Sequence, residues 1–485
     1  MLQHKILQLL SRLEADEFKG FQRFLQSPFF NSNARILIFY NQLKKYYPEF
    51  DSPKLSREKL FAKIYPNKKY HYQQFANLIS ELTRLTEEYL IQLAFKKDQF
   101  QRRKKLIESY GQRNLYDLYQ KETHAYLQQL SEVGTIEDHQ QRYLLLNDWY
   151  FHPLTEKNQS SFIQSGLLVK ELDQFYLQAK LLLAVELKNR EKLFKEKHDF
   201  LLLPALIALA KQKEDNPTIY FYYLFLQLVE KPTSENYQIL KKYFLENAEK
   251  VNRELNISSF RILNNYCLLA IRNGKKLYAK EHLELYQIGI EKNLILINQT
   301  ITPFSYLNAI TSGILCDQIE WVKTFITQYQ QYLNNNFKAE TVTLGKALIA
   351  FAEENYELIT DLLPSAKFNL LRNSISAKSL LVRAYFEMAL KDDSYFDLFT
   401  YNLSAFSKYL QRVKNLGEHP LKAHQNFVNL LGKFYKILSQ FKPKETDLDE
   451  LLATVKTTQP LSSPRWLINR IEKSKERIKY RQHPL

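Results

Sequence analysis

Glycine and proline are both scarce in this chain, with 10 glycines and 15 prolines among 485 residues. Average usage would be roughly 7 % and 5 %. Sandwiches and barrels need many tight turns with positive φ, which glycine supplies, and parallel α/β sheets use glycine at their strand-to-helix turns. The shortage therefore argues against both classes and favours long helices with short connections.

Sequence motifs for catalysis and cofactor binding are also missing. No two glycines are closer than 15 residues, so a phosphate-binding loop, a dinucleotide fingerprint and a nucleophile elbow are absent. None of the ten histidines has another histidine four residues away or a carboxylate three residues before it, as metal ligands sharing a helix face would. We predict a non-enzyme with no catalytic, cofactor-binding or metal-ligating residues and no cofactor. An active site assembled from separated residues is a third, less supported hypothesis.

Two cysteines cannot form a disulfide framework. Cys267 and Cys316 both fall inside apolar helical patterns, where buried small residues are expected. The first residues lack the apolar block of a signal peptide. The most apolar stretch, residues 200–210, is far shorter than the roughly 20 residues of a membrane span. We therefore expect a cytoplasmic protein with no integral membrane association.

Positive charge is concentrated at the two ends. The chain has a net charge of +16, of which residues 1–110 contribute +9 and residues 391–485 contribute +7, whereas the middle is close to neutral. This distribution is compatible with polyanion contact at the ends. Lysine-rich, solvated helix faces explain it equally well, and we favour that interpretation.

Apolar residues recur at helical spacing along nearly the whole chain. Residues 2–13 and 75–93 each place their leucines, isoleucines and aromatic rings on one stripe, as an amphipathic helix does. No sustained alternating run of β-branched residues occurs. The sequence therefore predicts an all-α fold.

Short breaks divide these helical patterns into pairs. Three successive helix hairpins are expected at 255–293, 304–334 and 338–363. Asp317 and Glu320 have the spacing of a capping box, which predicts that Asp317 begins the second helix of the middle hairpin. A long basic helix is expected through residues 96–105.

Small residues and aromatic rings recur at related positions of the hairpin region. They are Cys267, Gly274, Ala279, Ser312, Trp321, Ala347 and Tyr356. This pattern resembles the tetratricopeptide-like repeat superfamily, in which small residues let two helices approach closely and an aromatic residue packs near the turn. Tyr286 and Ile359 depart from the pattern, because that family usually has small residues there. The resemblance implies an irregular α-solenoid.

Several segments stand out in the layout of the chain. They are an LQSPFFN turn near the N-terminus, the segment at 308–333, the segments at 380–390 and 403–414, and a basic final helix with Trp466. This layout resembles a family of uncharacterised bacterial helical proteins. This second resemblance supports the helical fold and implies no activity.

Three further segments have alternative interpretations. Asp138 and His139 could be half of an acid-base pair, but adjacent helix residues point in different directions, and an exposed helix start is the better interpretation. The aromatic cluster at 220–225 could stack nucleic-acid bases, although a bulky core is favoured. The basic, amphipathic segment 466–481 could bind a partner, but a helix that caps the last layer of the solenoid is preferred.

We divide the chain into a basic N-terminal helical region (1–110), an array of helix hairpins (111–440) and a basic C-terminal capping region (441–485). The predicted function is a protein-protein interaction scaffold that holds a protein or peptide on the solenoid surface. The alternative is a nucleic-acid-binding protein that uses the basic ends, with Arg102, Arg103, Lys104 and Lys105 as contacts.

Overall fold

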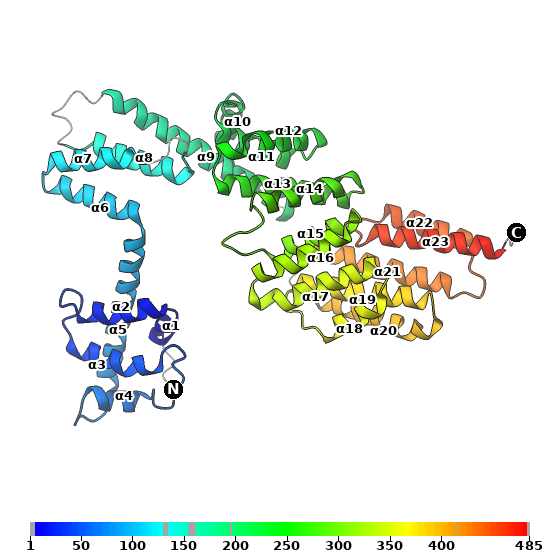
Figure 1. Cartoon of the computed structure of the whole chain (residues 1–485), viewed down its shortest axis with the longest axis horizontal. Helices are drawn as coiled ribbons and strands as arrows, with labels where there is room; N and C mark the ends of the chain where they lie inside the picture. The colour runs from blue at the N-terminus through cyan, green and yellow to red at the C-terminus, as the bar shows by residue number, and fades with distance from the viewer. Residues whose placement is uncertain (1–4, 130–133, 154–161, 195, 415, 483–485) are drawn as a thin grey trace. The chain divides into compact units, whose positions relative to one another are not determined.

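The computed structural model describes residues 5–129, 134–153, 162–194, 196–414 and 416–482. Within these ranges the regular elements are helices, accompanied by two isolated β-bridges, Ile297 with Thr300 and Ile301 with Leu333 (Figure 1). The all-α fold is therefore confirmed. The chain forms two compact units, Met1–Lys180 and Leu181–Leu485. The division at 110 and 440 is a different partition and stays a prediction.

The first unit begins with helices that pack around a long helix, α5. Tyr40 and Tyr89 bury their rings in this core, and each hydroxyl donates to a backbone carbonyl of α2, at 2.8 Å to Phe18 and 2.9 Å to Glu17. Buried tyrosines need such partners because an unsatisfied hydroxyl is costly. The helices are α1 (Lys5–Ser11), α2 (Ala15–Gln26), α3 (Ala34–Leu43), η1 (Lys44–Tyr46), α4 (Arg57–Ile64) and α5 (Tyr72–Lys97).

A second core in this unit includes Phe100, Tyr119 and Trp149. Its helices are α6 (Gln99–Gln112), α7 (Tyr116–Leu127), α8 (Ile136–Tyr150) and the beginning of α9 (Phe162–Phe194). The predicted continuous helix through 96–105 is wrong. Asp98 is extended, ends α5, and accepts a hydrogen bond from the backbone of Gln101 at 2.9 Å as the N-cap of α6. An aspartate favours such a helix start because its side chain satisfies a free backbone N–H.

The second unit is a succession of antiparallel helix pairs. The second helix of one pair also packs against the first helix of the next, from α11 to α22, which makes the unit an irregular α-solenoid. The helices are α10 (Leu203–Lys211), α11 (Pro217–Glu230), α12 (Ser234–Asn247), η3 (Ala248–Lys250), α13 (Arg253–Arg272), α14 (Leu277–Glu291), α15 (Pro303–Leu315), α16 (Ile319–Tyr329), η4 (Gln330–Tyr332), α17 (Asn335–Ala352), α18 (Tyr356–Ser365), α19 (Leu371–Ala389), η5 (Asp393–Tyr395), α20 (Phe396–Arg412), α21 (Glu418–Leu438), α22 (Glu445–Thr457) and α23 (Pro464–Gln482).

The three predicted hairpins are confirmed as α13–α14, α15–α16 and α17–α18. Gly313 explains how closely the middle pair packs, since a Cβ at this position would lie only 2.3 Å from Cγ2 of Val322. Cys267 is buried as expected, whereas Cys316 is only partly buried at the end of α15.

The turn between α15 and α16 corrects the predicted capping box. Asp317 has a φ of +59°, so it lies in the left-handed region after the end of α15. The next residue, Gln318, is the N-cap of α16 without a side-chain cap bond, and its N–H donates to the carbonyl of Gly313 at 2.8 Å. This is the hydrogen bond that closes a helix C-terminus. The tight reversal therefore uses Asp317 to end one helix, not to begin the next.

Candidate interaction surface

The solenoid of the second unit curves enough to bring α23 back to α13. Nη2 of Arg465, near the start of α23, lies 3.4 Å from the carbonyl oxygen of Ile271, near the end of α13. Helices α14 to α22 lie between these two helices along the chain. Figure 1 shows the end of the α13–α14 pair beside the start of α23. The array therefore has an inner side, on which these distant helices meet.

One face of α19 lies on this inner side and is polar. Its residues are spaced by three or four positions, which places them within one arc of the helix. At its end the Glu387 side chain is 2 % exposed, accepts a hydrogen bond from Trp466 Nε1 at 2.7 Å, and forms an ion pair with Arg470 of α23. Burial raises the pKa of Glu387, and Arg470 opposes this effect. The face comprises Arg372, Ser376, Ser379, Arg383 and Glu387.

Arg383 lies between two aromatic rings on this face. Its guanidinium carbon is 4.8 Å from the ring centre of Phe351 and 5.9 Å from that of Trp466, within the range of a cation-π contact. Its Nε donates to the carbonyl of Ser379 at 3.4 Å. Desolvation lowers the pKa of Arg383 to about 10, although the charge of Glu387 opposes the shift. In the described parts of the chain, Arg383 forms no ion pair.

The second half of α13 contributes a second group of polar residues. Arg261, Asn265 and Arg272 are exposed and share one face, because three turns separate the two arginines. Desolvation lowers the pKa of Arg272, and the like charge of Arg372 lowers it further. We call these three residues, together with the α19 face, the inner face.

Arg372 is held above an aromatic ring, with its guanidinium carbon 5.8 Å from the ring centre of Phe304. No ion pair of Arg272 or Arg372 exists among the residues that the structure describes. Arginine side chains near each other normally gain carboxylate partners, because like charges repel in a partly desolvated place. The inner face therefore holds arginines whose charge is not balanced within the described chain.

The basic residues at 102–105 differ from the arginines of the inner face, because most of them are in ion pairs. Arg103 pairs with Glu122 at 3.2 Å, Lys104 pairs with Asp148 at 3.3 Å, and Lys105 pairs with Glu108 at 2.6 Å. Three of the four residues named as nucleic-acid contacts are thus already in ion pairs within the first unit, and Arg102 points toward the carbonyl of Lys96 at 3.5 Å.

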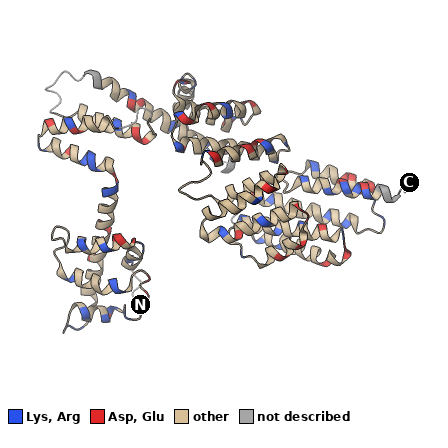
Figure 2. Ribbon diagram, in the orientation of Figure 1, with Lys and Arg blue, Asp and Glu red and all other residues tan. Residues whose placement is uncertain are grey.

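The C-terminal helix α23 is packed against its neighbours, and its basic residues Arg470 and Lys475 form ion pairs. Lys475 lies 3.2 Å from Glu445 and 2.7 Å from Asp449, and Figure 2 shows basic and acidic residues mixed along α22 and α23. Leu467 and Ile471 are fully buried against the preceding helices. This packing is what a helix that caps the last hydrophobic layer requires.

The histidine of the Asp138–His139 pair is buried, so the predicted exposed helix start is wrong for His139. Its Nδ1 lies 2.5 Å from Oε2 of Glu171 in α9, and Arg142 lies 3.4 Å from the same carboxylate. Asp138 closes a capping box with Thr135 instead. Sequence reasoning missed this cluster because Glu171 is 32 residues from His139, and only the packing of α8 and α9 brings them together.

Burial alone would raise the pKa of Glu171, but the hydrogen bond and charge of His139 and the charge of Arg142 outweigh it, and the net pKa is lowered. The carboxylate is therefore held ionised by its partners. Since all three side chains are less than 10 % exposed, this cluster fastens α8 to α9 and offers little access to a substrate.

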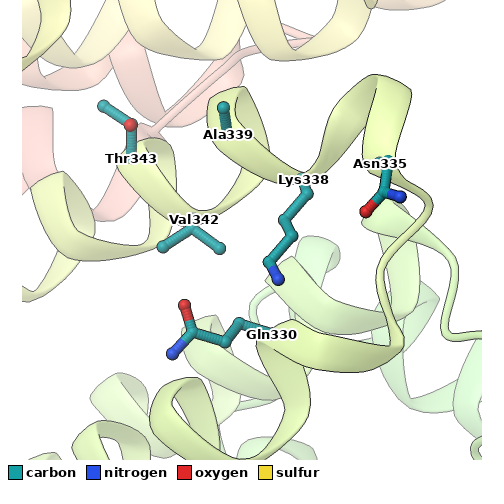
Figure 3. A pocket seen from close by; sticks show the side chains of 6 residues that line it. All are labelled: Gln330, Asn335, Lys338, Ala339, Val342 and Thr343. Carbon is teal, nitrogen blue, oxygen red and sulfur yellow. The ribbon is translucent and has the colours of Figure 1, made fainter.

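Two surface hollows of the second unit are small. One of about 360 Å³ lies where α17 follows α16, and Figure 3 shows Lys338 and Val342 extending from α17 toward the segment that carries Gln330. Another of about 310 Å³ runs along α12. Neither brings a nucleophile next to a base. No group of three histidine, cysteine or acidic side chains in the described ranges could hold a metal ion.

The aromatic cluster at 220–225 lies on α11. Phe221 and Phe225 are fully buried, and Tyr220 packs against Tyr243 of α12 with ring centres 4.9 Å apart. The favoured interpretation as a core is therefore correct for these rings. Over the described residues no helix is long and apolar enough to cross a membrane.

Comparisons of the whole chain with protein-family models, with curated proteins and with solved structures find no match.

Proposed function

We propose that this protein is a non-catalytic, cytoplasmic scaffold that binds a protein or peptide on a tetratricopeptide-like solenoid. The observation that carries the proposal is the inner face of the second unit. There a curved array of hairpins presents exposed arginines that have no ion-pair partners in the described chain. Solenoids use such curved faces to bind extended partners, because successive hairpins supply side chains in register.

The test is affinity capture of the full chain from native lysate at about 150 mM salt, with mass spectrometry before and after nuclease treatment. A scaffold is expected to return a protein partner that survives the nuclease. The comparison variant carries Arg261→Glu and Arg272→Glu, which reverse the charge of exposed residues on the inner face. Recovery of the same partner at the same yield from this variant would show that the partner does not bind at the inner face.

Nucleic-acid binding by the basic ends is the alternative. It predicts capture that is lost on nuclease treatment and a steep decrease of affinity with salt. The ion pairs of Arg103, Lys104, Lys105 and Lys475 weigh against it, because those charges are already neutralised by neighbouring carboxylates.

A further inference from the structure

Arginines of three helices far apart in the chain lie on the inner face, where α13 and α19 both contact α23. Arg272 ends α13, Arg372 lies in the first turn of α19, and Arg465 lies near the start of α23. The Arg465 guanidinium reaches the carbonyl of Ile271, the residue before Arg272. Arg372 is close enough to lower the pKa of Arg272 through its like charge.

Nothing in the described chain balances Arg272 and Arg372. The buried carboxylate of the inner face, Glu387, is already occupied by Trp466 and Arg470. Like charges placed close together repel each other. Arg272 and Arg372 therefore do not stabilise the folded state. Such arrangements are typical of binding sites, where stability is given up for function.

The chemistry of these residues favours carboxylates as ligands. A guanidinium presents parallel N–H groups that match the two oxygens of a carboxylate, and such bonds strengthen where solvent is partly excluded. The exposed ring of Phe304 beneath Arg372 adds an apolar contact beside the charge. Two arginines beside an aromatic ring can bind the carboxylates of a flexible acidic peptide.

A nucleic acid is a poorer match for this face. Nucleic-acid sites commonly use several phosphate contacts along a broad positive surface. The region that contributes α13 to α19 is close to neutral, with residues 231–390 carrying a net charge of only +3. We propose that the inner face of the second unit binds an acidic peptide segment, whose carboxylates pair with Arg272 and Arg372. This proposal rests on the scaffold function proposed above and names the chemistry of its partner.

The experiment measures binding of a fluorescein-labelled oligoglutamate peptide to the full chain by fluorescence anisotropy. The variant Arg272→Gln/Arg372→Gln is expected to bind about tenfold more weakly or worse, since it loses two charge-assisted contacts. The matched control is Arg412→Gln, an exposed arginine at the end of α20 with no ion pair among the described residues, and its affinity should equal that of the wild type.

A second readout separates a ligand-binding role from a structural one. Because Arg272 and Arg372 repel each other, the double variant should unfold at the same temperature as the wild type or a higher one. A clear decrease in its melting temperature would mean that the arginines hold the fold together, and would overturn the proposal even if binding were lost.

Three results would overturn the assignment of an acidic peptide. They are no binding of oligoglutamate at low salt, equal binding by the double variant, and stronger binding of single-stranded DNA that is lost in the double variant. The scaffold function would still stand if lysate capture returned a nuclease-resistant partner that the double variant retained. It would fail together with this proposal if capture returned no protein, or only proteins that are lost on nuclease treatment.

Discussion

Each compact unit contains a deeply buried glutamate, and the two differ in the direction of their pKa shift. Glu171 in the first unit and Glu387 in the second are both 2 % exposed. The pKa of Glu171 is lowered, whereas that of Glu387 is raised. Glu171 faces a histidine and an arginine that are themselves buried, while Glu387 faces one arginine and a neutral indole. The exposed fractions are equal, but Glu387 is more strongly desolvated and also feels the like charge of Glu354, whereas the two partners of Glu171 outweigh its desolvation.

The largest effect is expected from removing the charge of Glu171. The Glu171→Gln variant leaves His139 and Arg142 buried without a carboxylate, and breaking a buried pair in this way costs about 3–5 kcal/mol. Denaturant unfolding of the full chain at pH 7 measures the loss, with the transition of each unit followed separately. A loss below about 1 kcal/mol would contradict the view that the partners hold this carboxylate ionised.

The pH dependence should differ in sign between the two glutamates. A lowered folded-state pKa means that the contribution of Glu171 is present above the unfolded pKa, about 4.3, and is lost as pH falls through the folded pKa. A raised pKa means that Glu387 takes up a proton more readily when folded, so its contribution grows as pH falls toward about 4.3.

These signs are measured as the difference in unfolding free energy between the wild type and each glutamine variant, from about pH 7 to about pH 3. The cost of Glu387→Gln should increase as pH falls toward about 4.3, whereas the cost of Glu171→Gln should stay constant down to about pH 4.3 and decrease below it. Parallel curves for the two variants would show that the partners do not distinguish the two carboxylates.

A smaller loss is expected for Glu387→Gln at pH 7. The amide oxygen can still accept hydrogen bonds from Trp466 and Arg470, and the carboxylate that it replaces is already disfavoured by burial. We expect a loss of about 1.5–3 kcal/mol, the range for a hydrogen bond to a charged group. Chemical denaturation measures it, and a loss larger than that of Glu171→Gln would reverse the comparison.

The smallest effect is expected at the basic ends, where the ion pairs lie near the surface. Lys105→Gln and Lys475→Gln should each change the unfolding free energy by less than about 1 kcal/mol, because exposed pairs gain little from their Coulomb attraction. Thermal unfolding at low and high salt provides the measurement. A large, salt-sensitive loss would show that these pairs do more than neutralise charge.

Helical spacing predicted the hairpins well because it depends only on which residues are apolar. The pairs α13–α14, α15–α16 and α17–α18 lie where the pattern placed them. Turn chemistry was predicted less well. Asp98 and Asp317 are both short acids between helices, yet one begins a helix and the other adopts a left-handed conformation after one. An aspartate can cap the start of a helix or adopt a left-handed conformation after one. Which of the two occurs depends on the direction that the chain takes between the packed helices.

The buried polar clusters were not predictable from the sequence. His139 had no local partner within reach, and its carboxylate comes from the next helix, 32 residues later. Glu387 and Trp466 are 79 residues apart. The arginines of the inner face look like any other basic residues in the sequence, because nothing local distinguishes a charge that will be paired from one that will not.

The sequence by itself determined the all-α class, the positions of most helices and the hairpin pairing, since these follow from the spacing of apolar residues and the scarcity of glycine. Only the tertiary structure decided which charges are neutralised. The curvature of the second unit brings α13, α19 and α23 together, and that curvature arises from the packing of many successive helix pairs. An ion pair depends on distances of a few ångströms between remote residues, which no local pattern encodes.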